Sequence, residues 1–244
     1  MCWSIGASAA LTVAGFGTAA GARARGDKPA IWVTLGYFSA MEGLQAVTYL
    51  VIDACGGDTN RLLTMLAYIH IAFQPVFINL ISMTFIPDEA RRRVSPVVYG
   101  LCAASAIYML LQLYPFDWSS QCLIGQALCG TQLCAVSGTW HIGWEVPYRN
   151  FILPAFPTYI AVGFILPILY GSWRFTLFHF VTGPAAAYLS TPNANEWPAV
   201  WCLYSVGLVL IALMGPLRRW FRVEKWFWPA SWDRRLGSGA APPV

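Results

Sequence analysis

The sequence predicts an all-α fold, a polytopic membrane protein built as a bundle of seven transmembrane helices. The 244 residues are 57% hydrophobic and only 11% charged, with a mean hydropathy of +0.55, whereas a soluble domain carries about 25% charged residues. Mostly apolar runs of roughly 20 residues, the length of a membrane-spanning helix, recur along the chain. Basic residues gather after alternate runs, as they do in multi-pass proteins.

The apolar runs fill most of the chain up to residue 217 and predict one transmembrane domain over residues 1–217. Each run is long enough to cross the hydrocarbon core of a bilayer as a helix. The predicted spans are 3–22, 30–52, 62–86, 96–116, 151–170, 173–190 and 197–217.

Lysine and arginine predict the orientation, because cytoplasmic loops carry them in excess. Of the 15 basic residues, all but Arg61 and Arg149 follow the first, third, fifth or seventh span. The N-terminus is therefore expected outside and the C-terminus in the cytoplasm. No basic residue precedes the first span, so we expect a retained helix and not a cleaved signal peptide. The net charge of +4 then reflects orientation in a lipid bilayer, and no nucleic-acid partner is expected.

Most cysteines fall at the outer ends of the spans, where an oxidising compartment favours disulfides. The spacing of Cys122, Cys129 and Cys134 does not match the Cys-x2-Cys pairs of zinc sites, although metal binding stays open as an alternative. The sequence does not determine the pairing. The disulfide candidates are Cys2, Cys55, Cys122, Cys129 and Cys134.

The outer loop at 117–150 is the longest segment predicted to be non-helical, and loops of this length are usually functional or disordered. Its aromatic residues Trp118, Trp140, Trp144 and Tyr148 argue against disorder. We expect a cap tied by disulfides. The loop either contributes an aromatic belt at the membrane interface or closes over a site in the bundle.

Three ionisable side chains, Glu42, His70 and His179, lie inside predicted spans. Intramembrane ionisable groups are costly and therefore indicate functional sites. From the outer end of each span, a rise of about 1.5 Å per residue places all three at a depth of roughly 13–17 Å. Because their depths agree, we expect them to meet in the bundle core. Gln45, Tyr49 and Gln74 lie on the same helix faces and are the expected polar network around them.

A carboxylate and imidazoles are ligands that zinc and other transition metals accept. Glu42, His70 and His179 are therefore candidate ligands of a transition metal, most plausibly zinc, that activates water to hydrolyse a lipid or other amphiphile. Glu42, His141 and Glu196 are the candidate catalytic residues, the last two as a fourth ligand or proton carrier. Three alternatives stay open: a structural polar network, proton or substrate translocation, and a non-enzymatic subunit packed against partner subunits of a respiratory or photosynthetic complex.

Several stretches resemble an uncharacterised family of bacterial polytopic membrane proteins that begin Met-Cys-Trp-Ser or Met-Cys-Phe-Ser. This resemblance implies a multi-pass protein of the bacterial inner membrane and no particular activity. The chain is also loosely similar to seven-helix membrane zinc hydrolases of the ceramidase kind, but it lacks their paired histidines on the last helix. The stretches that carry the family resemblance are Met1-Cys2-Trp3-Ser4, Leu35 to Gln45, His70 to Pro75 and Trp140 to Tyr148.

After the last span, residues 218–236 mix arginine and lysine with tryptophan and phenylalanine. Such a mixture is typical of a segment at the cytoplasmic surface of a membrane. The small residues of 237–244 predict a disordered tail.

Overall fold

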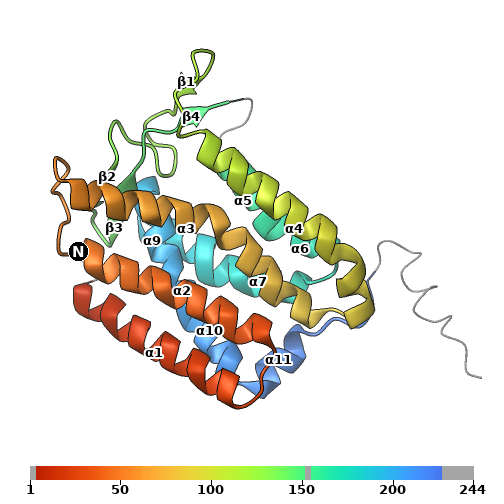
Figure 1. The fold of residues 1–244 in the computed structure, drawn as a ribbon. Helices are drawn as coiled ribbons and strands as arrows, with labels where there is room; N and C mark the ends of the chain where they lie inside the picture. Colours follow the sequence, from red (N-terminus) through yellow and green to blue (C-terminus); the bar gives the residue numbers. More distant parts are fainter. Residues whose placement is uncertain (1–3, 152–154, 227–244) are drawn as a thin grey trace, which may run out of the picture.

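The first half of the protein forms four long helices joined by short turns (Figure 1). The structure, a computed structural model, describes residues 4–151 and 155–226. The helices are α1 (Ile5–Ala24), α2 (Pro29–Thr48), α3 (Asp58–Ser82), which continues into the 3-10 turn η1 (Met83–Phe85), and α4 (Asp88–Leu111).

The second half forms helices that contain breaks. The first of these interrupted helices comprises α5 (Ala155–Ile160), η2 (Ala161–Ile165) and α6 (Leu166–Leu169). The second comprises α7 (Trp173–Phe180), η3 (Val181–Ala185) and α8 (Ala186–Ser190). The third comprises η4 (Ala194–Glu196), α9 (Trp197–Val200), η5 (Trp201–Leu203) and α10 (Tyr204–Leu213), and α11 (Gly215–Phe221) follows. Both η2 and η3 are π-helical turns.

Local sequence explains where these helices begin and change pitch. The Ser4 side chain caps α1 by accepting a hydrogen bond from the Ala7 amide at 3.3 Å. Pro29 begins α2, where its missing N–H leaves no bond unmade. Pro167 lies two residues after the end of η2, and Pro184 lies within η3. Because proline disrupts the regular α-helical hydrogen bonds, it accounts for both π-helical turns.

Small residues bring α1 close to α2. A side chain at Gly15 would clash with Ser39, and one at Gly43 would press against Thr12 at 3.3 Å. Close approach at small residues is typical of helices that pack in membranes. Helix α1 also packs against α10, so the first and last long helices are neighbours.

The segment between α4 and α5 forms two small antiparallel sheets, which the all-α prediction misses. Strand β1 (Ser120–Gln121) pairs with β4 (Arg149–Asn150), and β2 (Cys134–Ser137) pairs with β3 (Ile142–Glu145). These strands are too short to give a clear alternating pattern in the sequence. Together with the turns around them they form the cap, which lies at one end of the bundle, while α11 lies at the other (Figure 1).

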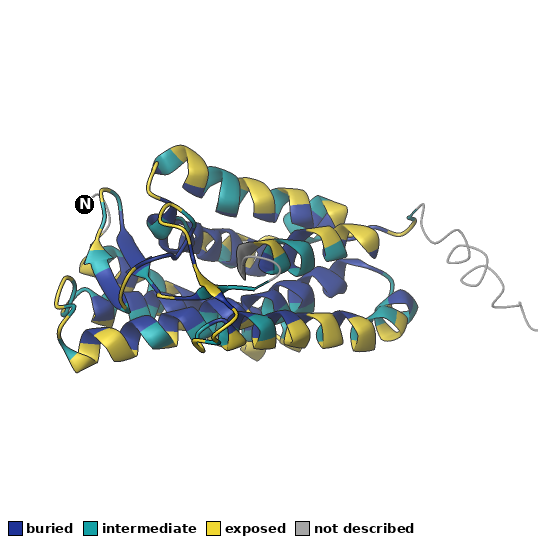
Figure 2. Cartoon of the chain, turned by 90° about the horizontal axis from the view of Figure 1, so that it is seen from above, coloured by how far each residue is buried: buried dark blue, intermediate teal, exposed yellow. Residues whose placement is uncertain are grey.

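One hydrophobic core runs from the bundle into the cap. Trp144 and Tyr148 of the cap belong to the same buried cluster as Leu35 and Tyr68 of the helices. Exposed residues gather on the outward faces of the helices (Figure 2). The cap is therefore a packed part of the domain.

The described residues include four helices long and apolar enough to cross a membrane: Ile5–Ala24, Asp58–Phe85, Asp88–Leu111 and Ala194–Leu213. The other three predicted spans are also largely helical but do not reach that standard. Helix α2 is as long as α1 but carries Glu42 and Gln45, and Pro157–Leu169 is a shorter apolar helix. The predicted tail, 237–244, and residues 227–236 of the predicted surface segment lie outside the described residues.

Candidate functional site

Glu42 lies fully buried on α2, where that helix faces α1 and α10. The Ser205 hydroxyl on α10 donates to Oε1 of Glu42 at 3.4 Å, and Ser8 on α1 makes a further side-chain hydrogen bond to the carboxyl group. One helical turn along α2, Nε2 of Gln45 donates to Sγ of Cys202 at 2.8 Å. We call these five residues the polar seam. Glu42 and Gln45 are both buried on α2 but bond to different residues.

His179 of α7 lies fully buried where α7 packs against η5 and α10. Its Nε2 accepts a hydrogen bond from the Trp201 indole at 3.1 Å, so the proton of the neutral ring lies on Nδ1. The ring also packs against Tyr204 and Phe164, with centroids 4.1 and 4.5 Å away. A side chain at Gly183 would clash with Trp201, so the glycine in η3 allows this indole to reach His179.

The third ionisable residue, His70, lies half-buried on α3, away from the contacts of Glu42 and His179. Its ring stacks on Tyr37 with a centroid distance of 3.8 Å, and the Tyr37 hydroxyl donates to the His70 carbonyl at 2.5 Å. One turn further along α3, Oε1 of Gln74 accepts a hydrogen bond from the Tyr159 hydroxyl at 2.6 Å. The predicted polar network is therefore divided among separate helix contacts.

The structure does not bring Glu42, His70 and His179 together as a metal site. Within residues 4–151 and 155–226, no group of three or more His, Cys, Asp or Glu residues is placed to hold a metal ion. The sequence argument fails because depth along a helix axis does not determine which neighbour the side chain faces. The donor set thus does not fit zinc, and no metal-dependent step follows from this geometry.

Glu196, a candidate catalytic residue, instead anchors the cap. Its Oε1 accepts a hydrogen bond from the Thr139 amide at 2.9 Å, and its Oε2 accepts from the amides of Trp140 and His141 at 2.8 and 2.9 Å. A side chain at Gly138 would clash with this carboxylate. Both oxygens are occupied by backbone donors, which favours a structural role over proton transfer.

His141 is buried in the cap, beside the C-terminal end of α2. Its Nδ1 accepts hydrogen bonds from the Ile142 amide at 2.8 Å and, in the tautomer this requires, from the Tyr49 hydroxyl at 3.0 Å. Burial lowers the pKa of His141 to about 3, so the imidazole is neutral near pH 7. Tyr49 and His141 thus join the bundle to the cap.

Two disulfides tie the cap, as predicted from the grouping of the cysteines at one end of the expected spans. Cys55 pairs with Cys134 and Cys122 with Cys129. Cys2, the remaining candidate, lies outside the described residues.

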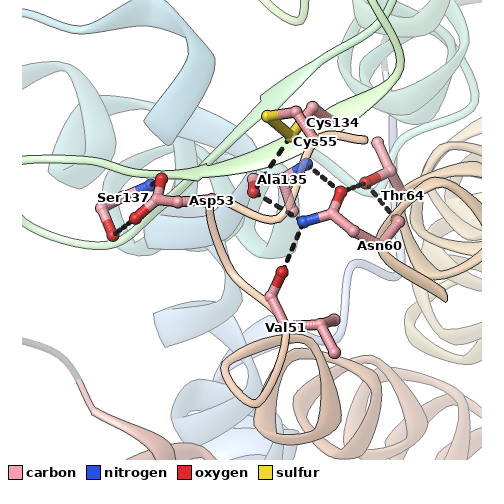
Figure 3. The surroundings of a disulfide bond; sticks show 8 residues. All are labelled: Val51, Asp53, Cys55, Asn60, Thr64, Cys134, Ala135 and Ser137. Carbon is pink, nitrogen blue, oxygen red and sulfur yellow. Dashed lines mark hydrogen bonds between the residues drawn. A yellow bond between two sulfur atoms is a disulfide. The ribbon is translucent and has the colours of Figure 1, made fainter. Parts of the chain in front are cut away.

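Asn60 reinforces the Cys55–Cys134 attachment and is not apparent from the sequence (Figure 3). Its Oδ1 accepts from the Ala135 amide at 2.9 Å, and its Nδ2 donates to the carbonyls of Ala135 and Val51 at 3.0 and 2.8 Å. Nearby, the Asp53 carboxylate accepts bonds from the Ser137 amide and hydroxyl at 2.7 and 2.6 Å. No sequence pattern would have identified the pairings of Asn60 with Ala135 and of Asp53 with Ser137, because they join residues 75 and 84 positions apart.

The opposite end of the bundle is basic. Asp27, between α1 and α2, pairs with Arg218 of α11 at 2.6 Å and with Arg25 at 3.1 Å. Partial burial acts to raise the pKa of Asp27, but the two arginines outweigh it and hold the pKa below its usual value. Arg174 joins this end to α11 by donating to the carbonyls of Trp220 and Arg222 at 3.0 and 3.3 Å.

These features define a class of protein: a bundle of largely apolar helices with a disulfide-tied cap at one end and a basic surface at the other. Residues 6–222 match the model of a family described as a family of unknown function, DUF5765. The chain belongs to this family. The match begins after the Met1–Ser4 motif, so that motif is no part of the evidence for membership. No curated protein and no solved structure gives a significant match, and the looser similarity to zinc hydrolases gains no support.

Proposed function

We propose that the protein is a non-enzymatic subunit of the bacterial inner membrane, which crosses the bilayer seven times and packs beside a larger membrane-protein partner. The N-terminus and cap lie outside, and the basic end lies in the cytoplasm. Four long apolar helices, the disulfides at one end and the basic residues at the other support this arrangement.

The enclosure of the intramembrane polar groups is the observation that carries the non-enzymatic role. Glu42, His70 and His179 each lie in a separate helix contact, bonded to or stacked on a neighbouring side chain. Hydrogen bonds between membrane helices stabilise packing by about 0.6 to 2 kcal/mol each. These groups therefore stabilise the contacts between helices, a role that requires no open cavity.

Two helices at the periphery of the bundle, α1 and α4, have exposed apolar faces that suit contact with a partner protein. On α4 the side chains of Val97, Leu101 and Ile107 are 63%, 45% and 56% exposed, and on α1 those of Val13 and Phe16 are 74% and 47% exposed. Such apolar surface is covered by lipid, by a partner, or by both.

Two exposed glycines allow a matched test of these flanks. A side chain would have open space at Gly100 on α4 and at Gly17 on α1. We expect the wild type, purified from native membranes in mild detergent, to migrate as a complex larger than the 26.9 kDa chain in its micelle. Of the two variants Gly100→Trp and Gly17→Trp, the one on the flank that contacts the partner should release it. The other variant then serves as the control. A wild type that is monomeric at native abundance would contradict the proposal.

A second candidate, proton coupling, is favoured by Glu42 alone. This carboxyl group is fully buried, and in the described part of the chain it has no cationic partner. Proton flux into liposomes that is lost in Glu42→Gln but retained in Ser205→Ala would support it. Equal flux in protein-free liposomes would exclude it.

A further inference from the structure

A hollow of about 920 Å³ lies at the basic end, between the start of α7 and the segment after α11. Among the described residues it is lined by one carboxylate, Glu224, and by Trp173, Arg174, Arg219, Arg222, Lys225 and Trp226. Four cationic side chains against one carboxylate give the hollow a strong preference for anions.

The arginines of this end fall into two groups. Arg174 and Arg218 are occupied by backbone carbonyls and by Asp27. Arg219 and Arg222 are exposed, and in the described part of the chain neither guanidinium group takes part in an ion pair or hydrogen bond. Both also line a neighbouring hollow of about 310 Å³ that contains Lys28. Free guanidinium groups of this kind suit the bidentate recognition of phosphate.

An apolar stripe leads away from the same hollow. Trp173, Leu177, Phe180 and Val181 of α7 and η3 are 37%, 52%, 49% and 55% exposed. Their spacing of four, seven and eight residues places them on one helix face. At the other side of the hollow, Trp226 stacks on Trp173 with a centroid distance of 6.4 Å. A ligand that fits both features carries a phosphate joined to a long apolar chain.

We propose that Arg219 and Arg222 bind the phosphate of an anionic phospholipid in this hollow, while an acyl chain lies along the α7 stripe. The inference goes beyond the proposed subunit role and needs no partner protein. Tryptophan at headgroup level and arginine near anionic lipid are physically suited to this position.

Lipid binding by the purified protein in a neutral detergent tests the site. The probes are phosphatidylglycerol, phosphatidylcholine with the same acyl chains, glycerol phosphate and inorganic phosphate, and the readout is native mass spectrometry or calorimetry. The wild type should prefer phosphatidylglycerol, and Arg219→Gln/Arg222→Gln should weaken that binding about thirtyfold.

The matched control is Arg92→Gln/Arg93→Gln, which removes the same charge from the basic end but lies on α4, outside the hollow. It should keep nearly wild-type affinity. Equal losses in the two double variants would overturn the site, because they would indicate general attraction to positive charge.

A third variant separates the lipid from a soluble phosphate compound. Leu177→Gln should weaken phosphatidylglycerol severalfold and leave glycerol phosphate unchanged, because only the lipid has a chain to lie on the stripe. Inorganic phosphate that binds as tightly as phosphatidylglycerol would overturn the proposal in favour of a free anion. All variants change exposed side chains, so unchanged thermal unfolding verifies that each is folded.

Discussion

The two ends of the bundle are held by different kinds of interaction. At the cap end, disulfides and buried hydrogen bonds connect segments far apart in the sequence: Cys55 to Cys134, and Glu196 to the backbone of residues 139–141. At the basic end, partly exposed ion pairs such as Asp27–Arg218 connect the α1–α2 turn to α11, and among the described residues Arg219 and Arg222 make none. Buried and covalent links are expected to contribute several kcal/mol, and exposed pairs at most about 1 kcal/mol.

Of the changes proposed, removal of the Cys55–Cys134 disulfide should lower the stability of the cap end the most. The entropy of closing a loop of 79 residues corresponds to about 4.5 kcal/mol, and that of the 7-residue Cys122–Cys129 loop to about 2.5 kcal/mol. Cys55→Ser/Cys134→Ser should therefore lower the unfolding temperature in detergent more than Cys122→Ser/Cys129→Ser. The reverse order would mean that the cap is held mainly by its short loop.

Glu196→Gln tests the carboxylate that accepts three backbone N–H bonds. The amide keeps the shape but loses the charge and one acceptor, at a cost of about 1.5–3 kcal/mol. Denaturant unfolding of the purified protein measures it, with Glu89→Gln on α4 as control, a carboxylate whose side chain is 42% exposed and pairs only with the Arg93 side chain among the described residues. A loss no larger than that of the control would contradict the anchoring role.

Acid should loosen the cap through His141. Its pKa is lowered to about 3 in the folded state from an ordinary value near 6.5, so the neutral ring stabilises the fold above pH 6.5. As the pH falls from 6.5 toward 3, this contribution decreases by about 1.4 kcal/mol per pH unit. Protease sensitivity of the cap at pH 5.5 should exceed that at pH 7.5 in the wild type, and His141→Gln should reduce the pH difference. An identical pH difference in both proteins would show that another group is responsible.

The smallest effect is expected at the basic end. Asp27→Asn removes the charge from two ion pairs in which the Asp27 side chain is 16% exposed, so we expect a loss of up to about 1 kcal/mol that shrinks in high salt. Because its pKa is lowered, the Asp27 contribution is present above about pH 4 and is lost as the pH falls below that value. Melting at low and high ionic strength measures this, and a loss equal to that of Glu196→Gln would remove the contrast between the ends.

The features predicted from the sequence are those set by local pattern. Apolar runs predicted where the helices lie, and the grouping of the cysteines at one end of the expected spans predicted the disulfides. The i+3 spacing of Glu42 and Gln45 falls within the continuous helix α2, where both are buried. Each of these depends on residues near one another in the chain or on the same side of the bundle.

The features that the sequence did not predict depend on how distant faces meet. Glu42, His70 and His179 have similar expected depths, but their helices present them to different neighbours, so no group of three potential metal ligands forms among the described residues. Glu196 was expected to be catalytic, whereas the cap folds its backbone amides onto the carboxylate. The short cap strands and the Asn60 contacts are likewise set by tertiary pairing.

The most direct test of the account is whether the two ends lie on opposite sides of a membrane. Asp117 in the cap and Arg92 on α4 are both exposed, and each is changed to cysteine in a Cys2→Ser background, in which free Cys102 and Cys202 are buried. A membrane-impermeant maleimide applied to intact cells should label Asp117→Cys, and should label Arg92→Cys only after the cells are broken. Labelling of both from outside, or of Arg92→Cys alone, would contradict the proposed topology.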